Sequence, residues 1–112
     1  MEIQQEQVGD VWVVNVHGRL DGITSTAFSN HVGELFTGRI PKILIDLTDM
    51  DFITSAGLRE LLLLAKKANA SGTAFALCGV NDQVRQVVDI GGFTTIFNLH
   101  SGRAEALAAL KG

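Results

Sequence analysis

The chain is poor in the features that mark disulfide-rich, membrane-spanning and exported proteins. Its one cysteine, Cys78, has no second cysteine with which to form an internal disulfide. No apolar run reaches the ~20 residues that a membrane-spanning helix needs. The opening residues, MEIQQE, lack the basic and apolar blocks of a signal peptide. Together these absences predict a cytoplasmic protein that does not insert into a membrane.

An excess of positive charge is also missing, as is any break in composition. The net charge of −3 offers no general attraction to nucleic acid or to anionic lipid. There is one proline, Pro41, and the chain contains no internal repeat, low-complexity tract or linker. With 112 residues, 46% of them hydrophobic and 19% charged, residues 1–112 are expected to form one globular domain around a single core.

Motifs of the common enzyme classes are absent. Neither the phosphate-binding pattern G-x-x-x-x-G-K-[ST] nor the dinucleotide pattern G-x-G-x-x-G occurs. Ser55 lies where a strand is expected to turn into a helix, but its surroundings, TSAG, lack the first glycine of the G-x-S-x-G nucleophile elbow. The sequence therefore disfavours a serine hydrolase, and no cofactor is expected.

A metal site is equally disfavoured. The histidines are scattered along the chain, and Cys78 has no partner at a ligand spacing. The acidic residues between positions 46 and 51 lack the spacing of a calcium loop. Solvated loop carboxylates explain them better than metal ligands do.

Strands and helices instead alternate along the sequence. A hairpin is expected from residues 3–8 and 11–17, because Gly9-Asp10 between them supplies a turn. Further strands are expected at residues 43–47, 73–78 and 95–99. Helices are expected after Thr24 or Ser25, over residues 55–70, after Asn81 or Asp82 and before Gly91-Gly92, and after a Ser101 cap. The order β-β-α-β-α-β-α-β-α predicts an α/β domain, in which a mixed sheet, with an antiparallel hairpin and parallel crossovers, is covered by about four helices.

Chemistry-bearing residues follow the predicted strands. Ligands of open α/β sheets usually bind beyond the carboxyl ends of the strands, and Asp21, Asp46, Asp51, Thr54 and Ser55 all lie on such connections. We therefore expect the three carboxylates to lie near Ser55. Thr54 and Ser55 also compete for a simpler role, because both residue types are favoured helix N-caps.

The helix expected over residues 55–70 has two unlike sides. At about 100° per residue, one side gathers Gly57, Leu58, Leu61, Leu62, Leu64, Ala65 and Ala68. The other side gathers Ser55, Ala56, Arg59, Glu60, Leu63, Lys66 and Lys67. The first side is predicted to be core. Leu63 is then either an isolated exposed leucine or the apolar centre of a docking face with a charged rim, and the wheel leaves both interpretations open.

Three stretches resemble STAS domains of the kind found in anti-sigma-factor antagonists. ILIDLTDMDFITSAGLREL (43–61) is similar to the family signature, GRLD (18–21) to its Gly-x-Leu-Asp, and LCGVNDQVRQVVDIGGFTTIF (77–97) to its later segment. The resemblance covers nearly the whole chain. It implies that Ser55 is the phosphoacceptor and that Asp21 lines the site. Thr54 stands where the family commonly has an acidic residue, so it is a possible second acceptor.

The resemblance implies a bacterial partner-switching protein of transcription regulation, not an enzyme. The unphosphorylated form would bind an anti-sigma factor that is also a serine-protein kinase and so release a sigma factor. Phosphorylation of Ser55 would end binding, and a phosphoserine phosphatase would restore it. The expected partner-binding residues are Asp21, Thr54 and Ser55, which the resemblance implies, together with Ala56, Arg59, Glu60 and Leu63, which share the exposed side of the helix with Ser55. Two alternatives stay open: a non-switching STAS subunit of a transport ATPase complex, and a small Ser/Thr-dependent hydrolase.

Overall fold

The structure is a computed structural model that describes residues 1–35, 42–90 and 98–110. Its elements, in chain order, are β1 (Glu2–Val8), β2 (Val11–Leu20), α1 (Ser25–Leu35), β3 (Lys42–Asp46), β4 (Met50–Ile53), α2 (Ser55–Ala70), β5 (Ala74–Cys78), α3 (Asp82–Ile90), β6 (Leu99–His100) and α4 (Arg103–Leu110). Among these helices, none has both the length and the apolar character that a bilayer crossing requires.

The described strands form one mixed sheet, as predicted. Its order is β1-β2-β3-β5-β6, with β4 beside the far end of β2. The hairpin of β1 and β2 is antiparallel, and all the other pairings are parallel. The predicted α/β class and the hairpin are therefore confirmed.

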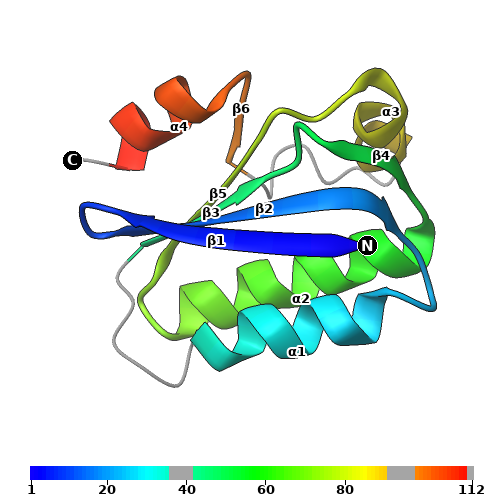
Figure 1. Ribbon diagram of the computed structural model, residues 1–112, viewed down its shortest axis with the longest axis horizontal. Coiled ribbons are helices and arrows are strands. Elements are labelled where there is room, and N and C mark those ends of the chain that lie inside the picture. The colour runs from blue at the N-terminus through cyan, green and yellow to red at the C-terminus, as the bar shows by residue number, and fades with distance from the viewer. Residues whose placement is uncertain (36–41, 91–97, 111–112) are drawn as a thin grey trace.

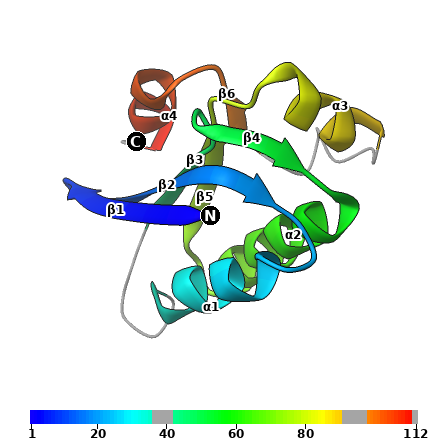
Figure 2. The ribbon, with the colours of Figure 1, turned by 45° about the vertical axis from the view of Figure 1, so that its right-hand side comes forward.

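Helices cover both faces of this sheet (Figure 1). Along β3, Ile43 and Ile45 point into the larger core, which α1 and α2 close, whereas Leu44 points to the smaller core under α4. This alternation explains why residues 43–47 are apolar almost without interruption: a strand buried on both faces has no polar side. The third helix, α3, packs beside β4 (Figure 2).

Strand β4 was not predicted. No strand was expected between residues 47 and 55, but residues 50–53 pair in parallel with residues 18–20, which extend β2 beyond its predicted end at residue 17. A register shift between Gly18 and Arg19 lets the two short segments meet. The sequence signal is weak because β4 is only four residues long.

Near the C-terminus the agreement is partial. The strand expected at residues 95–99 is seen as β6 at Leu99–His100, and residues 95–97 and the Gly91-Gly92 helix end lie outside the described residues. The predicted Ser101 cap is displaced, because α4 begins at Arg103 and Gly102 directly precedes it. Asn81, by contrast, does cap α3, since its side-chain oxygen accepts a hydrogen bond from the Val84 N–H at 2.8 Å.

Candidate functional site: the start of helix α2

The ends of β2 and β4 bring two distant segments together at the start of α2. Leu20 lies opposite Ile53 in the strand register, and the Thr54 N–H donates to the Leu20 carbonyl at 3.0 Å. The next residues on the two strands, Asp21 and Thr54, therefore begin loops at the same sheet edge. This is the edge at which the sequence placed the site.

Gly57 permits this close approach. A β-carbon at position 57 would overlap the carbonyl oxygen of Leu20 and lie 3.0 Å from Cγ1 of Ile53. The loop that follows β2 is also near, because a β-carbon on Gly22 would lie 3.9 Å from that of Ala56. The first turn of α2 thus rests directly on the end of β2 and on its loop.

Thr54 and Ser55 have different roles. Thr54 is the N-cap of α2: its backbone is extended, and its hydroxyl oxygen accepts a hydrogen bond from the Gly57 N–H at 3.3 Å. Ser55 is the first helical residue, and it is exposed. Its hydroxyl has no hydrogen-bond partner among the residues that the structure describes. The competition for the cap is therefore resolved in favour of Thr54, and Ser55 presents its hydroxyl to solvent.

Asp21 organises the loop beside this turn. One of its carboxylate oxygens accepts hydrogen bonds from the N–H groups of Ile23 at 2.9 Å and Thr24 at 3.0 Å, and from the Thr24 hydroxyl at 3.2 Å. Arg19 lies 3.3 Å from the other oxygen. The hydrogen bond from the Thr24 N–H is the main cause that holds the pKa of Asp21 below its usual range. A fixed negative charge therefore lies on the loop that adjoins α2.

Exposed apolar side chains occur on the two segments that adjoin the start of α2. Ile23, on the Asp21 loop, is 88% exposed, and Phe52, on β4, is 38% exposed. The guanidinium carbon of Arg19 lies 5.1 Å from the centre of the Phe52 ring, a cation–π contact. Sequence reasoning missed both apolar residues. A large apolar residue inside the loop DGIT was the signal that could have identified Ile23.

The predicted two sides of α2 are confirmed. Gly57, Leu58, Leu61, Leu64 and Ala68 are buried, with Leu62 and Ala65 packed against the core. The opposite side exposes Ser55, Ala56, Arg59, Leu63, Lys66 and Lys67, with Glu60 partly exposed. Leu63 is 51% exposed. It is therefore not a core residue, and it lies on the same side of the helix as Ser55.

Asp46 does not join this site, so the expectation for it was wrong. It continues the alternation of β3 after Leu44, and its side chain lies on the α4 face of the sheet. There it is 4% exposed, and it accepts hydrogen bonds from the Thr48 N–H at 3.0 Å and from Arg103 Nε at 3.0 Å. Asp51, unlike the nearly buried Asp46, is exposed to solvent, and it lies on β4, the strand that leads to Thr54 and Ser55.

Cys78 is not a reactive nucleophile. Burial is the largest cause that raises the pKa of Cys78 to about 12, and Asp46 adds to it. A thiol with so high a pKa is unreactive at neutral pH. Within the described part of the chain, no group of three or more histidine, cysteine, aspartate or glutamate side chains could hold a metal ion.

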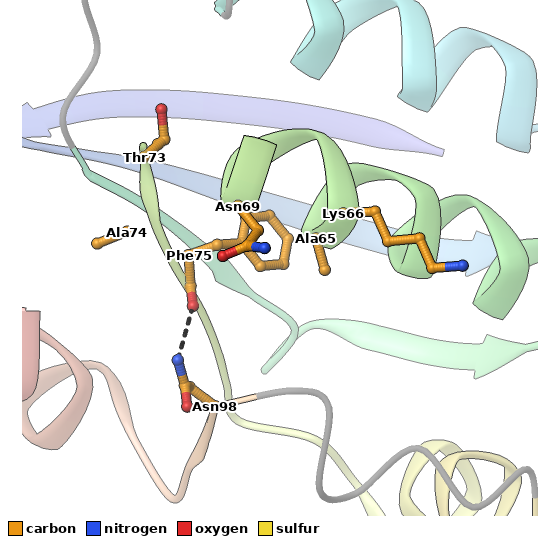
Figure 3. A pocket seen from close by; sticks show the side chains of 7 residues that line it. All are labelled: Ala65, Lys66, Asn69, Thr73, Ala74, Phe75 and Asn98. Atoms are coloured by element: carbon orange, nitrogen blue, oxygen red, sulfur yellow. Dashed lines mark hydrogen bonds between the residues drawn. The ribbon is translucent and has the colours of Figure 1, made fainter. Parts of the chain in front are cut away.

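A hollow of about 380 Å³ lies at the opposite end of α2 from Ser55 (Figure 3). It is lined by Ala65, Lys66, Asn69, Thr73, Ala74, Phe75 and Asn98. The Asn98 amide donates to the Phe75 carbonyl at 3.2 Å and so joins β5 to the segment before β6. Because Ser55 precedes the nearest lining residue by more than two helical turns, this hollow is not part of the Ser55 surface.

Comparison with known proteins identifies the family. The family model of the STAS domain matches residues 2–106, and this chain belongs to that family. BtrV of Bordetella bronchiseptica is 33% identical over 96 residues, which cover 82% of this chain and 83% of BtrV. The anti-sigma F factor antagonist of Paenibacillus polymyxa is 29% identical over 112 residues, which cover 99% and 96% of the two chains.

A solved structure of an anti-sigma factor antagonist is also similar to this chain. The anti-sigma factor antagonist from Mycobacterium paratuberculosis is 26% identical and superposes with a TM-score of 0.92, covering 99% of this chain and 94% of the other. The resemblance drawn from residues 18–21, 43–61 and 77–97 is therefore confirmed. The site residues were predicted partly from this resemblance and partly from the exposed side of the helix at residues 55–70, and their roles remain a prediction.

Proposed function

We propose that this STAS domain is an anti-sigma factor antagonist that works by partner switching. In its unphosphorylated form it binds an anti-sigma factor, which then releases its sigma factor. The names of relatives that match nearly the whole chain support this role. The observation that carries it is the exposed hydroxyl of Ser55 on the first turn of α2, which has no hydrogen-bond partner among the described residues, with exposed apolar side chains on the adjoining loop and strand.

The binding surface, which we term the docking face, surrounds that hydroxyl. It consists of Asp21, Ile23, Phe52, Thr54, Ser55, Ala56, Arg59, Glu60 and Leu63. Three exposed apolar residues within a charged rim match the usual anatomy of a protein interface, in which an apolar centre excludes water and a polar border fixes orientation. Ile23 carries the greatest exposed fraction of the three and is expected to be the strongest anchor.

Phosphorylation of Ser55 would end binding without unfolding the domain. Helix α2 has no acidic residue in its first turn, so its free N–H groups and its dipole favour a negative group there. The phosphate adds a charge of about −1.5 to −2 and a hydration shell in the middle of the docking face. Asp21, already ionised beside the turn, adds like-charge repulsion. A loss of roughly 3–4 kcal/mol would lower affinity a few-hundredfold.

Ser55 is preferred over Thr54 as the acceptor. The Thr54 hydroxyl oxygen is occupied as the helix cap, and the side chain is half-buried, whereas Ser55 is exposed. A kinase needs the acceptor oxygen free to approach the transferred phosphoryl group in line. Modification of Thr54 would first require its hydrogen bond to Gly57 to break.

The partners follow from the same mechanism. The anti-sigma factor would itself be the serine-protein kinase, and a separate phosphoserine phosphatase would reset the switch. Residues 1–112 would act as one STAS domain in the bacterial cytoplasm, as a substrate and a ligand rather than a catalyst. No basic side chain bonds the Ser55 hydroxyl within the described residues, so nothing described there activates it as a nucleophile.

A phosphorylation assay tests the proposal. The protein is incubated with ATP, Mg²⁺ and purified anti-sigma factors of the serine-kinase type, and mass spectrometry locates the phosphate. We expect one phosphate on Ser55, retained in Thr54→Val and lost in Ser55→Ala. Transfer to Thr54 in Ser55→Ala at the full rate would contradict the assignment of the acceptor. A failure of every kinase to bind or modify the protein would favour the non-switching subunit of a transport complex.

A pair of surface variants tests the docking face. Ile23→Ser removes the most exposed apolar side chain and should weaken binding of the anti-sigma factor by about 1–2 kcal/mol, with no loss of thermal stability. Val8→Ser is the matched control, because Val8 is also exposed but lies at the hairpin end of β1 (Figure 1). Equal affinity of the wild type and Ile23→Ser would remove Ile23 from the docking face.

A further inference from the structure

Strand β4 has one paired edge and one edge that no strand covers in the described structure. Its pairing partner is β2, which it meets over residues 18–20. The backbone groups of Ile53 point the other way: its N–H donates to Oε1 of Gln83 at 3.0 Å, and its carbonyl accepts from Nε2 of Gln83 at 3.2 Å. One side-chain amide therefore bonds Ile53 as a residue of a neighbouring strand would.

Asn81 makes a second attachment between the same segments. Its amide nitrogen donates to the Met50 carbonyl at 2.8 Å and to the Asp51 carbonyl at 3.3 Å. Its amide oxygen meanwhile caps α3 at Val84. The start of α3 thus covers the free edge of β4 from Met50 to Ile53, and the packing of α3 against β4 is visible in Figure 2.

We infer that Gln83 is a positioning residue for the phosphoacceptor turn. Ile53, which Gln83 holds, is followed directly by the Thr54 cap and by Ser55. On the β2 side the Thr54 N–H is held by the Leu20 carbonyl. The backbone at residues 53–54 is therefore fixed from two directions, from β2 and from α3, and only the α3 attachment is made by a side chain. That this fixed backbone helps a kinase to reach Ser55 rests on the proposed function.

The chemistry of the attachment suits a primary amide. Ile53 offers both a donor and an acceptor, and the amide of Gln83 presents an acceptor oxygen and a donor nitrogen without a charge. Replacement of Gln83 by methionine keeps the length of the side chain but leaves the Ile53 N–H and carbonyl without partners. Gln86, on the same helix, is exposed, and its side chain makes no hydrogen bond within the described residues. Gln86→Met is therefore a matched control for the loss of an amide.

Hydrogen exchange measured by NMR tests the positioning role without any partner. In Gln83→Met we expect the amides of Thr54 and Gly57 to exchange about tenfold faster, because the loss of both hydrogen bonds to Ile53 eases local opening. The amides of Ile45 and Leu77, in the sheet centre, should be unchanged, as should every one of these amides in Gln86→Met. Unchanged protection of Thr54 and Gly57 in Gln83→Met would overturn the inference.

Phosphorylation kinetics then separate positioning from a purely structural role. With a kinase that modifies the wild type, Gln83→Met should lower kcat about tenfold and change KM less than twofold, because the docking face is intact while the hydroxyl is less fixed. A fall in thermal stability with kcat unchanged would mean that Gln83 is structural only. If no kinase modifies the wild type, the proposed function fails, and the exchange data still decide the positioning role.

A second variant covers the case in which Gln83→Met does not fold. Gln83→Glu keeps an acceptor for the Ile53 N–H but at neutral pH cannot donate to the Ile53 carbonyl. It should show the same direction of change at Thr54 and Gly57, with a smaller amplitude. Protection equal to that of the wild type in this variant would likewise contradict the inference.

Discussion

Gly57 lies against the carbonyl of Leu20 so closely that any side chain at position 57 would overlap it. The same carbonyl accepts the hydrogen bond of the Thr54 N–H. The carbonyl of Leu20 therefore fixes the residue at which α2 starts, and it also lies against the first turn of that helix. This contact connects the Asp21 loop to Ser55, although the two are more than thirty residues apart in the chain.

The first prediction concerns this contact. Gly57→Ala should lower the free energy of unfolding by about 1–3 kcal/mol, because the added methyl group must displace the end of β2 or the helix. Gly33→Ala is the control: a β-carbon there meets its nearest atom, Nζ of Lys67, only at 4.0 Å. It should stabilise α1 by roughly 0.5–1 kcal/mol. Urea unfolding of both variants measures the difference, and a stabilised Gly57→Ala would contradict the geometry.

The second prediction separates the two adjacent hydroxyl residues. Thr54→Ala should destabilise the domain by about 0.5–2 kcal/mol, since it removes the cap of α2. Ser55→Glu should keep or slightly raise stability, because a negative charge in the first turn favours the helix. It should nevertheless bind the anti-sigma factor poorly. Thermal melts and calorimetric titration together measure both effects. Unfolding of Ser55→Glu would move the switch from the interface to the fold itself.

The third prediction compares two leucines on opposite sides of α2. Leu61 is fully buried, whereas Leu63 is half-exposed. Leu61→Ala should cost about 2–5 kcal/mol of stability and leave the affinity of the folded fraction unchanged. Leu63→Ala should barely alter stability and should weaken partner binding by roughly 1–2 kcal/mol. Urea unfolding and a binding titration are needed for each. If Leu63→Ala binds like the wild type, Leu63 is an exposed leucine without a binding role.

The fourth prediction concerns the charged pair under α4. Arg103 Nη2 lies 2.9 Å from the nearly buried carboxylate of Asp46, and the guanidinium also contacts Glu6. Arg103→Met should cost about 1–3 kcal/mol at pH 7, because Asp46 is left buried without its cation, an effect reduced by the partial exposure of Arg103. Arg85→Met, which breaks an exposed pair with Asp89 at 3.6 Å, should cost less than about 0.5 kcal/mol.

The same pair should make stability depend on pH. Burial by itself raises the pKa of Asp46, but hydrogen bonds from Thr48 and Arg103 outweigh it and hold the pKa below its usual range. A lowered carboxyl pKa contributes stability above about pH 4, the range in which the unfolded carboxyl is ionised, and that stability is lost as the pH falls through the folded pKa. The difference between the wild type and Arg103→Met should therefore shrink from pH 7 to pH 3. A constant difference would contradict the ion pair.

The spacing of apolar residues along the sequence was enough to predict several strands and helices of the fold. The apolar run at residues 43–47 predicted a strand covered on both faces, and the wheel of residues 55–70 separated core from surface residue by residue. These predictions succeeded because burial is recorded in the spacing of apolar residues, whatever the partner is. The position of Ser55 and Asp21 after predicted strands made them candidates, and the family resemblance added the roles proposed for them, which no periodicity reveals.

The tertiary structure alone decided which distant groups meet. Strand β4 forms only because the end of β2 is free to pair with it, and Gln83 reaches Ile53 across thirty positions in the chain. Asp46 bonds Arg103 across fifty-seven positions, on the face away from Ser55. Such pairings depend on crossovers and on the direction in which a strand residue points, and neither is encoded in short-range spacing. The sequence therefore predicted most of the elements and singled out Ser55 as the candidate acceptor, whereas topology determined the surface around Ser55.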